Sequence, residues 1–108
     1  MTDVERRLIE AKCARRVMQN LDEIGRHIGS RTRTKQIIAS HGVVEGLRSI
    51  RKDATSGWND LYAARLLHLS VEATIVECAE FRRLFEPAEV EKMEQDLIDC
   101  EYTPRSPS

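Results

Sequence analysis

Apolar residues recur at three- and four-residue intervals along most of the chain, and this spacing constrains the fold more than any other feature. An amphipathic α-helix places such residues on one side, whereas a half-buried strand needs strict alternation. No alternating segment of four to eight residues is bounded by hairpin turn signals. The sequence therefore predicts an all-α protein, a compact bundle of four to five helices with no sheet.

The first helix is the most clearly marked. Thr2 stands three residues before Glu5, which is the spacing of a capping box, and Gly29 can end the helix in the left-handed conformation. We expect a helix over residues 3–28. Its apolar residues cover a wide arc and predict packing on two sides. They are Val4, Leu8, Ile9, Ala11, Cys13, Ala14, Val17, Met18, Leu21, Ile24 and Ile28.

Turn and capping residues divide the rest of the chain into further helices. We expect these over residues 34–52, 57–68, 70–84 and 86–101. Gly42 and Gly46 interrupt the first of them, either because the chain turns at Gly42 or because a neighbouring helix comes close. Pro87 after Glu86 is typical of a helix start. Residues 1–101 should form one domain, and residues 102–108 a flexible tail.

Composition supports a soluble globular protein. Of the 108 residues, 41 % are apolar and 32 % are charged, and no apolar run approaches the roughly 20 residues of a membrane span. The charged first 20 residues leave no room for a secretory apolar core. Three widely spaced cysteines, Cys13, Cys78 and Cys100, form no C-x-x-C pair, which favours buried thiols in a reducing, cytoplasmic compartment.

Positive and negative charge are divided between the two halves of the chain. Residues 1–52 hold 12 Lys and Arg against 6 Asp and Glu, whereas residues 53–108 hold 5 against 12. The halves therefore carry +6 and −7, although the whole chain carries only −1. This asymmetry suggests a charged partner, head-to-tail association, or attraction between basic and acidic helices within one bundle.

Two clusters of basic residues are the candidate surface for nucleic acid or another anion. Contacts of this kind neutralise phosphates, so the affinity should fall steeply with salt. The segment around Gly42 also has a helix–glycine–helix pattern, but Leu47 and Ile50 fall one residue early for a helix-turn-helix, which weakens that interpretation. The candidate residues are Arg26, Arg31, Arg33, Lys35, Arg48, Arg51 and Lys52.

Three polar residues, His68, Glu72 and Glu77, are the candidates for a ligand or enzymatic pocket between helices. The two glutamates lie in the most apolar segment, where burial would raise the pKa of either carboxyl. The sequence has no glycine-rich phosphate loop, no G-x-S-x-G and no group of His and Cys with metal-ligand spacing. We therefore expect no metal and no cofactor, and an enzyme is the less favoured interpretation.

Surplus apolar residues favour self-association. The wide arc of the first helix and the dense run at residues 71–85 exceed what a bundle of this size easily hides, since such a domain buries only about 65 % of its unfolded surface. We expect a small interaction module, a homodimer without catalysis. Nucleic-acid binding is the second hypothesis and a helical pocket the third. The candidate interface residues are Leu8, Met18, Trp58, Tyr62 and Leu67.

Overall fold

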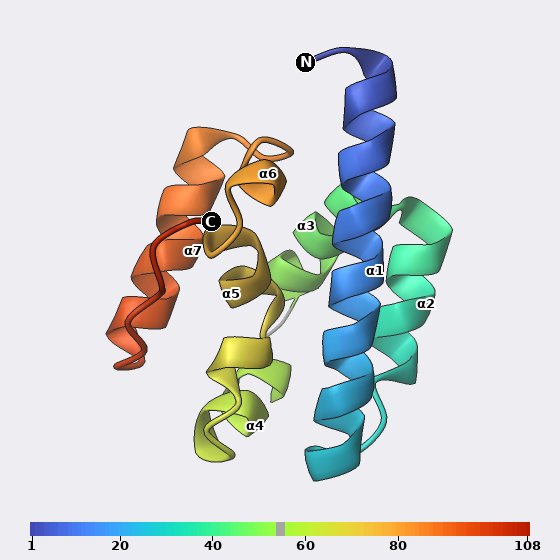
Figure 1. Ribbon diagram of the computed structural model, residues 1–108. Coiled ribbons are helices and arrows are strands. Elements are labelled where there is room, and N and C mark those ends of the chain that lie inside the picture. The colour runs from blue at the N-terminus through green and yellow to red at the C-terminus, as the bar shows by residue number, and fades with distance from the viewer. Residues whose placement is uncertain (54–55) are drawn as a thin grey trace.

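The computed structural model describes residues 1–53 and 56–108, and every regular element in these two ranges is a helix (Figure 1). Seven α-helices and one short 3-10 helix follow one another, and no strand occurs in the described ranges. The prediction of an all-α fold is therefore confirmed. Within the same ranges, no helix combines the length and the apolar character needed to cross a membrane.

Helix α1 (Asp3–Ile28) has the predicted bounds because both ends carry local signals. Thr2 Oγ1 accepts a hydrogen bond from the Glu5 amide at 3.1 Å, while the Glu5 carboxylate accepts one from the Thr2 amide at 3.4 Å. Gly29, with a φ of 111°, follows the last turn. Only one stripe of the helix is fully buried: Ile9, Cys13, Val17, Leu21 and Ile24.

The predicted helix over residues 34–52 is two helices, α2 (Thr32–His41) and α3 (Val43–Asp53). Gly42 separates them with a φ of 83°, a conformation that favours glycine, and its amide donates to the Ile38 carbonyl at 2.8 Å. Gly46 fits the other explanation given for these glycines, the close approach of a neighbouring helix. A Cβ on Gly46 would lie 2.9 Å from the Ile38 Cα, so its absence lets α2 and α3 pack closely.

The predicted helix over residues 57–68 ends early. Helix α4 (Ser56–Ala63) is followed by a turn and by a 3-10 helix, η1 (Leu67–Leu69). Arg65 adopts a φ of 60°, and the Leu66 amide donates to the Leu61 carbonyl at 2.8 Å. This is a Schellman-type helix end in which an arginine takes the position that glycine usually occupies.

The predicted helix over residues 70–84 is also two shorter helices, α5 (Val71–Val76) and α6 (Ala79–Arg82). Ser70 caps α5, because its hydroxyl oxygen accepts from the Ala73 amide at 3.1 Å. The chain is extended at Cys78, where φ is −127° and ψ is 117°. A side chain from α6 helps to satisfy the backbone at this break, since Arg82 Nε donates to the Val76 carbonyl at 2.7 Å.

Helix α7 (Pro87–Asp99) begins one residue and ends two residues inside the predicted range of 86–101. Glu86 and Glu89 form a capping box at its start, and Pro87 occupies the first turn. After Cys100, Glu101 takes a φ of 64° and the Tyr102 amide donates to the Leu97 carbonyl at 3.0 Å. The inward residues of α7 are Val90, Met93 and Leu97.

The C-terminal segment turns back along α7 and follows a defined path (Figure 1). Tyr102 Oη donates to Glu77 Oε2 at 2.5 Å, and the Arg105 amide donates to the same oxygen at 3.0 Å. Ser108 then pairs with the break between α5 and α6, donating to the Glu77 carbonyl and accepting from the Ala79 amide. The expected flexibility of residues 102–108 stays a prediction.

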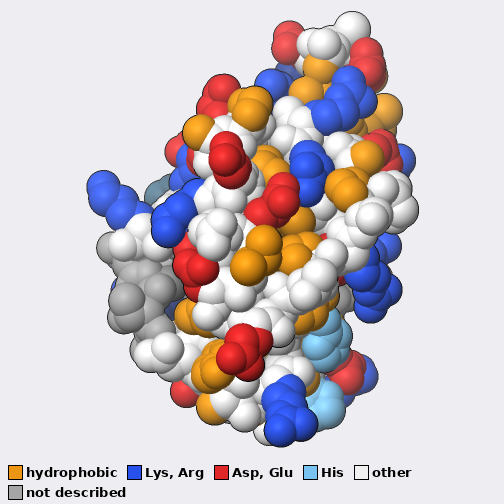
Figure 2. Space-filling view, turned by 90° about the vertical axis from the view of Figure 1, so that its left-hand side faces the viewer, with side chains coloured by type: hydrophobic (Ala, Val, Ile, Leu, Met, Phe, Trp, Pro, Cys, Tyr) orange, Lys and Arg blue, Asp and Glu red, His pale blue; other side chains and the backbone are white. Residues whose placement is uncertain are grey.

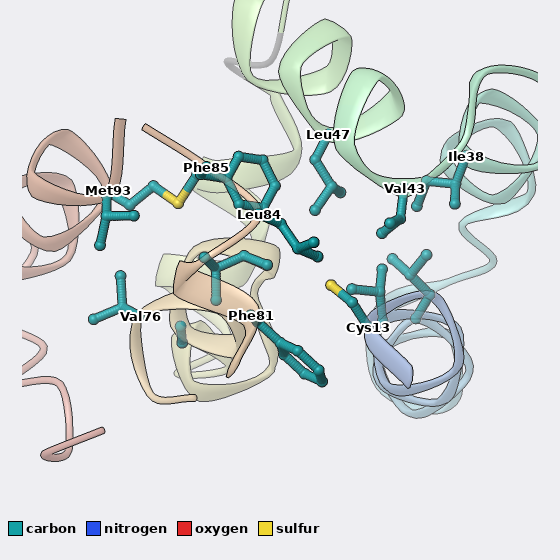
Figure 3. Close-up of a cluster of buried hydrophobic side chains, with 14 of the residues drawn as sticks. Cys13, Ile38, Val43, Leu47, Val76, Phe81, Leu84, Phe85 and Met93 are labelled. Carbon is teal, nitrogen blue, oxygen red and sulfur yellow. The ribbon is translucent and has the colours of Figure 1, made fainter. Parts of the chain in front are cut away.

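Short helix α5 lies between α1 on one side and α7 on the other (Figure 1). Side chains from α1, α2, α3, α5 and α7 and from the α6 region meet in one core (Figure 3). In this core Cys13 is fully buried, which raises the pKa of its thiol to about 12. Further members are Ile38, Val43, Leu47, Val76, Phe81, Leu84, Phe85 and Met93.

Candidate functional site

Five of the seven basic residues expected to bind nucleic acid form ion pairs within the fold. Arg26 pairs with Glu23 on its own helix at 2.9 Å, and Lys35 pairs with Asp22. Arg31 Nη2 lies 3.8 Å from Asp60 Oδ2. Arg48 and Arg51 each contact carboxylates of α7. Among the described residues, the remaining two, Arg33 and Lys52, have no ion-pair partner.

Arg48 joins α3 to the start of α7. Its Nε and Nη2 donate to the two oxygens of Glu89 at 2.9 and 2.8 Å, a two-pronged geometry that arginine favours. The guanidinium also contacts Glu45 and lies 5.9 Å from the centre of the Phe85 ring. The hydrogen bond from Arg48 lowers the pKa of Glu89.

Arg51 is the centre of a second, more buried charge cluster. Its Nη1 donates to Glu72 Oε2 at 2.5 Å and its Nη2 to Asp96 Oδ2 at 2.9 Å. Glu72 is only 7 % exposed, and burial raises its pKa although the charge of Arg51 opposes the shift. Burial also acts to raise the pKa of Asp96, but hydrogen bonds from Lys92 and Arg51 lower it overall.

These ion pairs bear on the helix-turn-helix interpretation. Helices α2 and α3 do meet at a glycine turn, as that motif requires. However, Arg48 and Arg51 of α3 are bound to Glu89, Glu72 and Asp96 of the same chain. Since a recognition helix must present its side chains to a groove of the DNA, this side of α3 is already occupied.

The five expected interface residues do not share one surface. Leu67 is buried, while Met18 and Trp58 are half-buried. Leu8 is 61 % exposed and Tyr62 is 50 % exposed, but Leu8 lies toward the N-terminal end of α1 and Tyr62 on α4, far from that end (Figure 1). The set therefore separates into a site on α1 and a site near α4.

The neighbours of Leu8 form an exposed apolar stripe on α1. Val4, expected on the inward face, is 67 % exposed, and Ala11 is exposed as well. Val4, Leu8 and Ala11 are spaced by four and three residues, so they share one side of the helix. Their spacing was visible in the sequence, but their exposure was not, because it depends on which side of α1 the other helices cover.

Four arginines of α1 have no ion-pair partner among the described residues. Two of them, Arg7 and Arg15, stand four residues before and after Ala11 and so border the stripe. None of the four belongs to the basic surface expected from the sequence. They are Arg6, Arg7, Arg15 and Arg16, and all are exposed.

Helix α7 carries an exposed apolar residue among carboxylates. Ile98 is 52 % exposed, and Glu91 and Glu94 lie seven and four residues before it, on the same side of the helix, while Glu101 follows just after the helix end. Arg82 pairs with Glu94, but Glu91 and Glu101 have no ion-pair partner in the described ranges. Figure 2, which views the molecule from the α7 side, shows acidic, basic and hydrophobic side chains mixed over this face.

The three expected pocket residues do not converge. His68 is exposed on η1, and Glu77 is held by Tyr102 and the C-terminal segment. Only Glu72 lines the cavity described next. In the two described ranges, no three His, Cys, Asp or Glu side chains are grouped so as to hold a metal ion.

A cavity of about 350 Å³ lies between α1, α3, α4, α5, α7 and the start of α2. The side chains of Leu21, Ile24, Ile50, Trp58, Leu61 and Val71 form its apolar walls. Trp58 Nε1 donates to the sulfur of Cys100 at 3.2 Å, which fixes the indole against the end of α7. The polar lining residues are Arg31, Thr34, Arg51, Ser70, Glu72, Asp96 and Asp99.

Comparisons of this chain with protein-family models, with curated proteins and with solved structures found no match.

Proposed function

We propose that this protein is a helical interaction module that forms a homodimer through the N-terminal part of α1. The observation that carries the proposal is the exposed stripe of Val4, Leu8 and Ala11 on a helix whose opposite side packs into the core. Amphipathic helices bind partners through apolar residues at this spacing. Burying Val4 and Leu8 would contribute about 1 kcal/mol or more each.

One edge of this part of α1, next to Leu8, is already held by the fold, so the helix is ordered before a partner arrives. Lys12 Nζ lies 3.5 Å from Glu80 of α6, and Glu5 lies 3.6 Å from Arg83, which follows α6. A preformed helix loses little conformational entropy on binding, and less of the interaction energy is needed to order it. The stripe is therefore suited to rigid docking.

A second copy of the chain supplies a matching surface. Arg7 and Arg15 border the stripe on α1, whereas Glu91 lies on the Ile98 side of α7 and Glu101 follows the end of that helix. Docking α1 of one copy against α7 of the other would bury apolar residues at the centre and place opposite charges at the rim. Two such contacts related by a twofold axis would close a dimer.

Substitution of Leu8 by Glu tests the proposed interface. We expect Leu8→Glu to convert a dimer into a monomer, because a charge placed in the apolar centre of a contact is desolvated without a partner. Light scattering on a gel-filtration column measures the mass directly. Tyr62→Glu is the matched control, since Tyr62 is also half exposed but lies on α4, and this variant should stay dimeric.

The same light-scattering measurement distinguishes the other outcomes. A wild-type monomer at micromolar concentration would overturn the proposal, as would a dimer that Tyr62→Glu breaks and Leu8→Glu does not. Nucleic acid that co-elutes with the protein and is removed by salt would instead favour the nucleic-acid hypothesis.

A further inference from the structure

The cavity between α1, α3, α4, α5, α7 and the start of α2 has one polar end that is suited to a negative charge. Arg31 is the N-cap residue of α2, and no side chain caps this helix start. Thr34, one turn into α2, lines the same cavity as Arg31. The N-terminal end of a helix carries unpaired amides and a partial positive charge, and both favour an anion.

Arg31 itself lacks a hydrogen-bond acceptor. Its Nη2 is buried, and no described residue accepts a hydrogen bond from it. The nearest carboxylate, Asp60, lies 3.8 Å away, which is too long for a hydrogen bond. Buried donors in proteins are nearly always paired, so an unpaired guanidinium nitrogen beside a cavity indicates a missing acceptor.

The remaining lining residues limit what the anion can be. Glu72 and Asp96 share Arg51, and Asp99 accepts from Gln95 at 2.7 Å, so three carboxylates already border the cavity. They would repel a second negative charge on a ligand, which disfavours phosphate. The apolar walls require a ligand with a hydrocarbon body, and a volume of about 350 Å³ keeps that body small.

We propose that this cavity binds a small organic monocarboxylate. The carboxylate accepts hydrogen bonds from Arg31, after a rotation of this long side chain, and from the Thr34 hydroxyl. The hydrocarbon body lies against Trp58, Leu61 and Ile24. This binding site is separate from the proposed interface on α1, and the two proposals can fail independently.

Trp58 provides the measurement, because it is the only tryptophan of the chain and it lines the cavity. We expect hexanoate to change the Trp58 fluorescence in a saturable way, with a Kd on the order of 1 mM for so small a ligand. Hexylamine and hexanol have the same hydrocarbon body without the carboxylate, and they should bind more weakly. No saturable change with hexanoate, or equal or tighter binding of hexylamine, would overturn the proposal.

Substitutions at the start of α2 test which residues contact the carboxylate. Arg31→Gln and Thr34→Val should each weaken hexanoate binding, about tenfold or more for the loss of the charged partner. Arg33→Gln is the matched control, because Arg33 is exposed on the same helix and does not line the cavity. Equal hexanoate affinity in Arg31→Gln and Arg33→Gln would overturn the assignment.

Circular dichroism checks that each variant is folded. If Arg31→Gln does not fold, the hexanoate affinity of Thr34→Val tests the carboxylate contact instead. Binding should persist in Leu8→Glu, whatever its mass. A wild-type protein that is monomeric but still binds hexanoate therefore counts against the function proposed above and leaves this inference in place.

Discussion

Glu72 shows how one buried residue couples the charge cluster to stability. Its carboxylate accepts from Arg51 at 2.5 Å while Asp96 shares the same guanidinium. Burial raises the pKa of Glu72 above the ordinary value of 4.5. A carboxyl with a raised pKa in the folded state binds its proton more tightly there, so the free energy of unfolding falls as the pH rises from the unfolded to the folded pKa.

Glu72→Gln removes this titration. We expect the stability of the variant, relative to the wild type, to improve as the pH rises from about 4 to 7, because only the wild type has to ionise a buried carboxyl. Urea unfolding of both proteins across this range measures the difference. Asp96→Asn should change in the opposite direction and at lower pH, below about 4, since the pKa of Asp96 is lowered from its ordinary value of 3.8. A relative stability of Glu72→Gln that falls with pH would contradict the account.

Single residues also explain why some helix ends escaped prediction. Arg65 and Glu101 take left-handed backbone conformations that the sequence would assign to glycine or asparagine. By contrast, Gly29 stands where the sequence predicts a helix end and Gly42 where a turn was one of two interpretations, and both have a positive φ. A helix end is therefore visible in the sequence where a glycine provides the left-handed backbone conformation, but not where a charged residue adopts that conformation.

Among the elements, α1 and α7 were the most predictable because each begins with a capping signal that acts over three residues. The break between α5 and α6 was not predictable. Its backbone groups pair with Ser108 and with the side chain of Arg82, and these contacts exist only after the chain has folded. Tertiary contacts thus divided an apolar run that has uninterrupted helical periodicity.

Gly46 gives a test at this scale. Gly46→Ala should lower the free energy of unfolding by about 1–3 kcal/mol, because the new Cβ would lie 2.9 Å from the Ile38 Cα and push α2 away from α3. Gly25→Ala is the control. Gly25 is also within a helix, and the nearest atom to an added Cβ is 3.7 Å away, so this variant should gain about 0.5–1 kcal/mol. Similar effects in thermal or urea unfolding would refute the close packing.

Across the whole molecule, the division of charge between the two halves serves the fold before any partner. Arg48 and Arg51 from the basic half bind Glu89, Glu72 and Asp96 from the acidic half. The sequence indicated that this pairing was one use of the asymmetry, but it could not say which charges would remain. That selection depends on which helices face one another. Among the described residues it left Arg6, Arg7, Arg15 and Arg16 of α1, and Glu91 and Glu101 near Ile98, without ion-pair partners.

The candidate sites were correspondingly harder to predict than the fold. Leu8 and Glu72 were singled out from the sequence, and the structure places the first on an exposed stripe and the second in a cavity wall. Their neighbours in space were not foreseen. Arg31 and Trp58 reach the cavity through the packing of α2 and α4, and no spacing along the chain brings them to Glu72.

The central claim is that α1 of one copy docks against the acidic face of α7 of another, and a charge swap tests it most directly. The measurement is the mass by light scattering of Arg15→Glu, Glu91→Arg and the double variant. We predict twice the 12.4 kDa chain mass for the wild type, a shift toward monomer for each single variant, and recovery of the dimer in the double variant. A wild-type mass of one chain, or single variants that stay dimeric, would contradict the account.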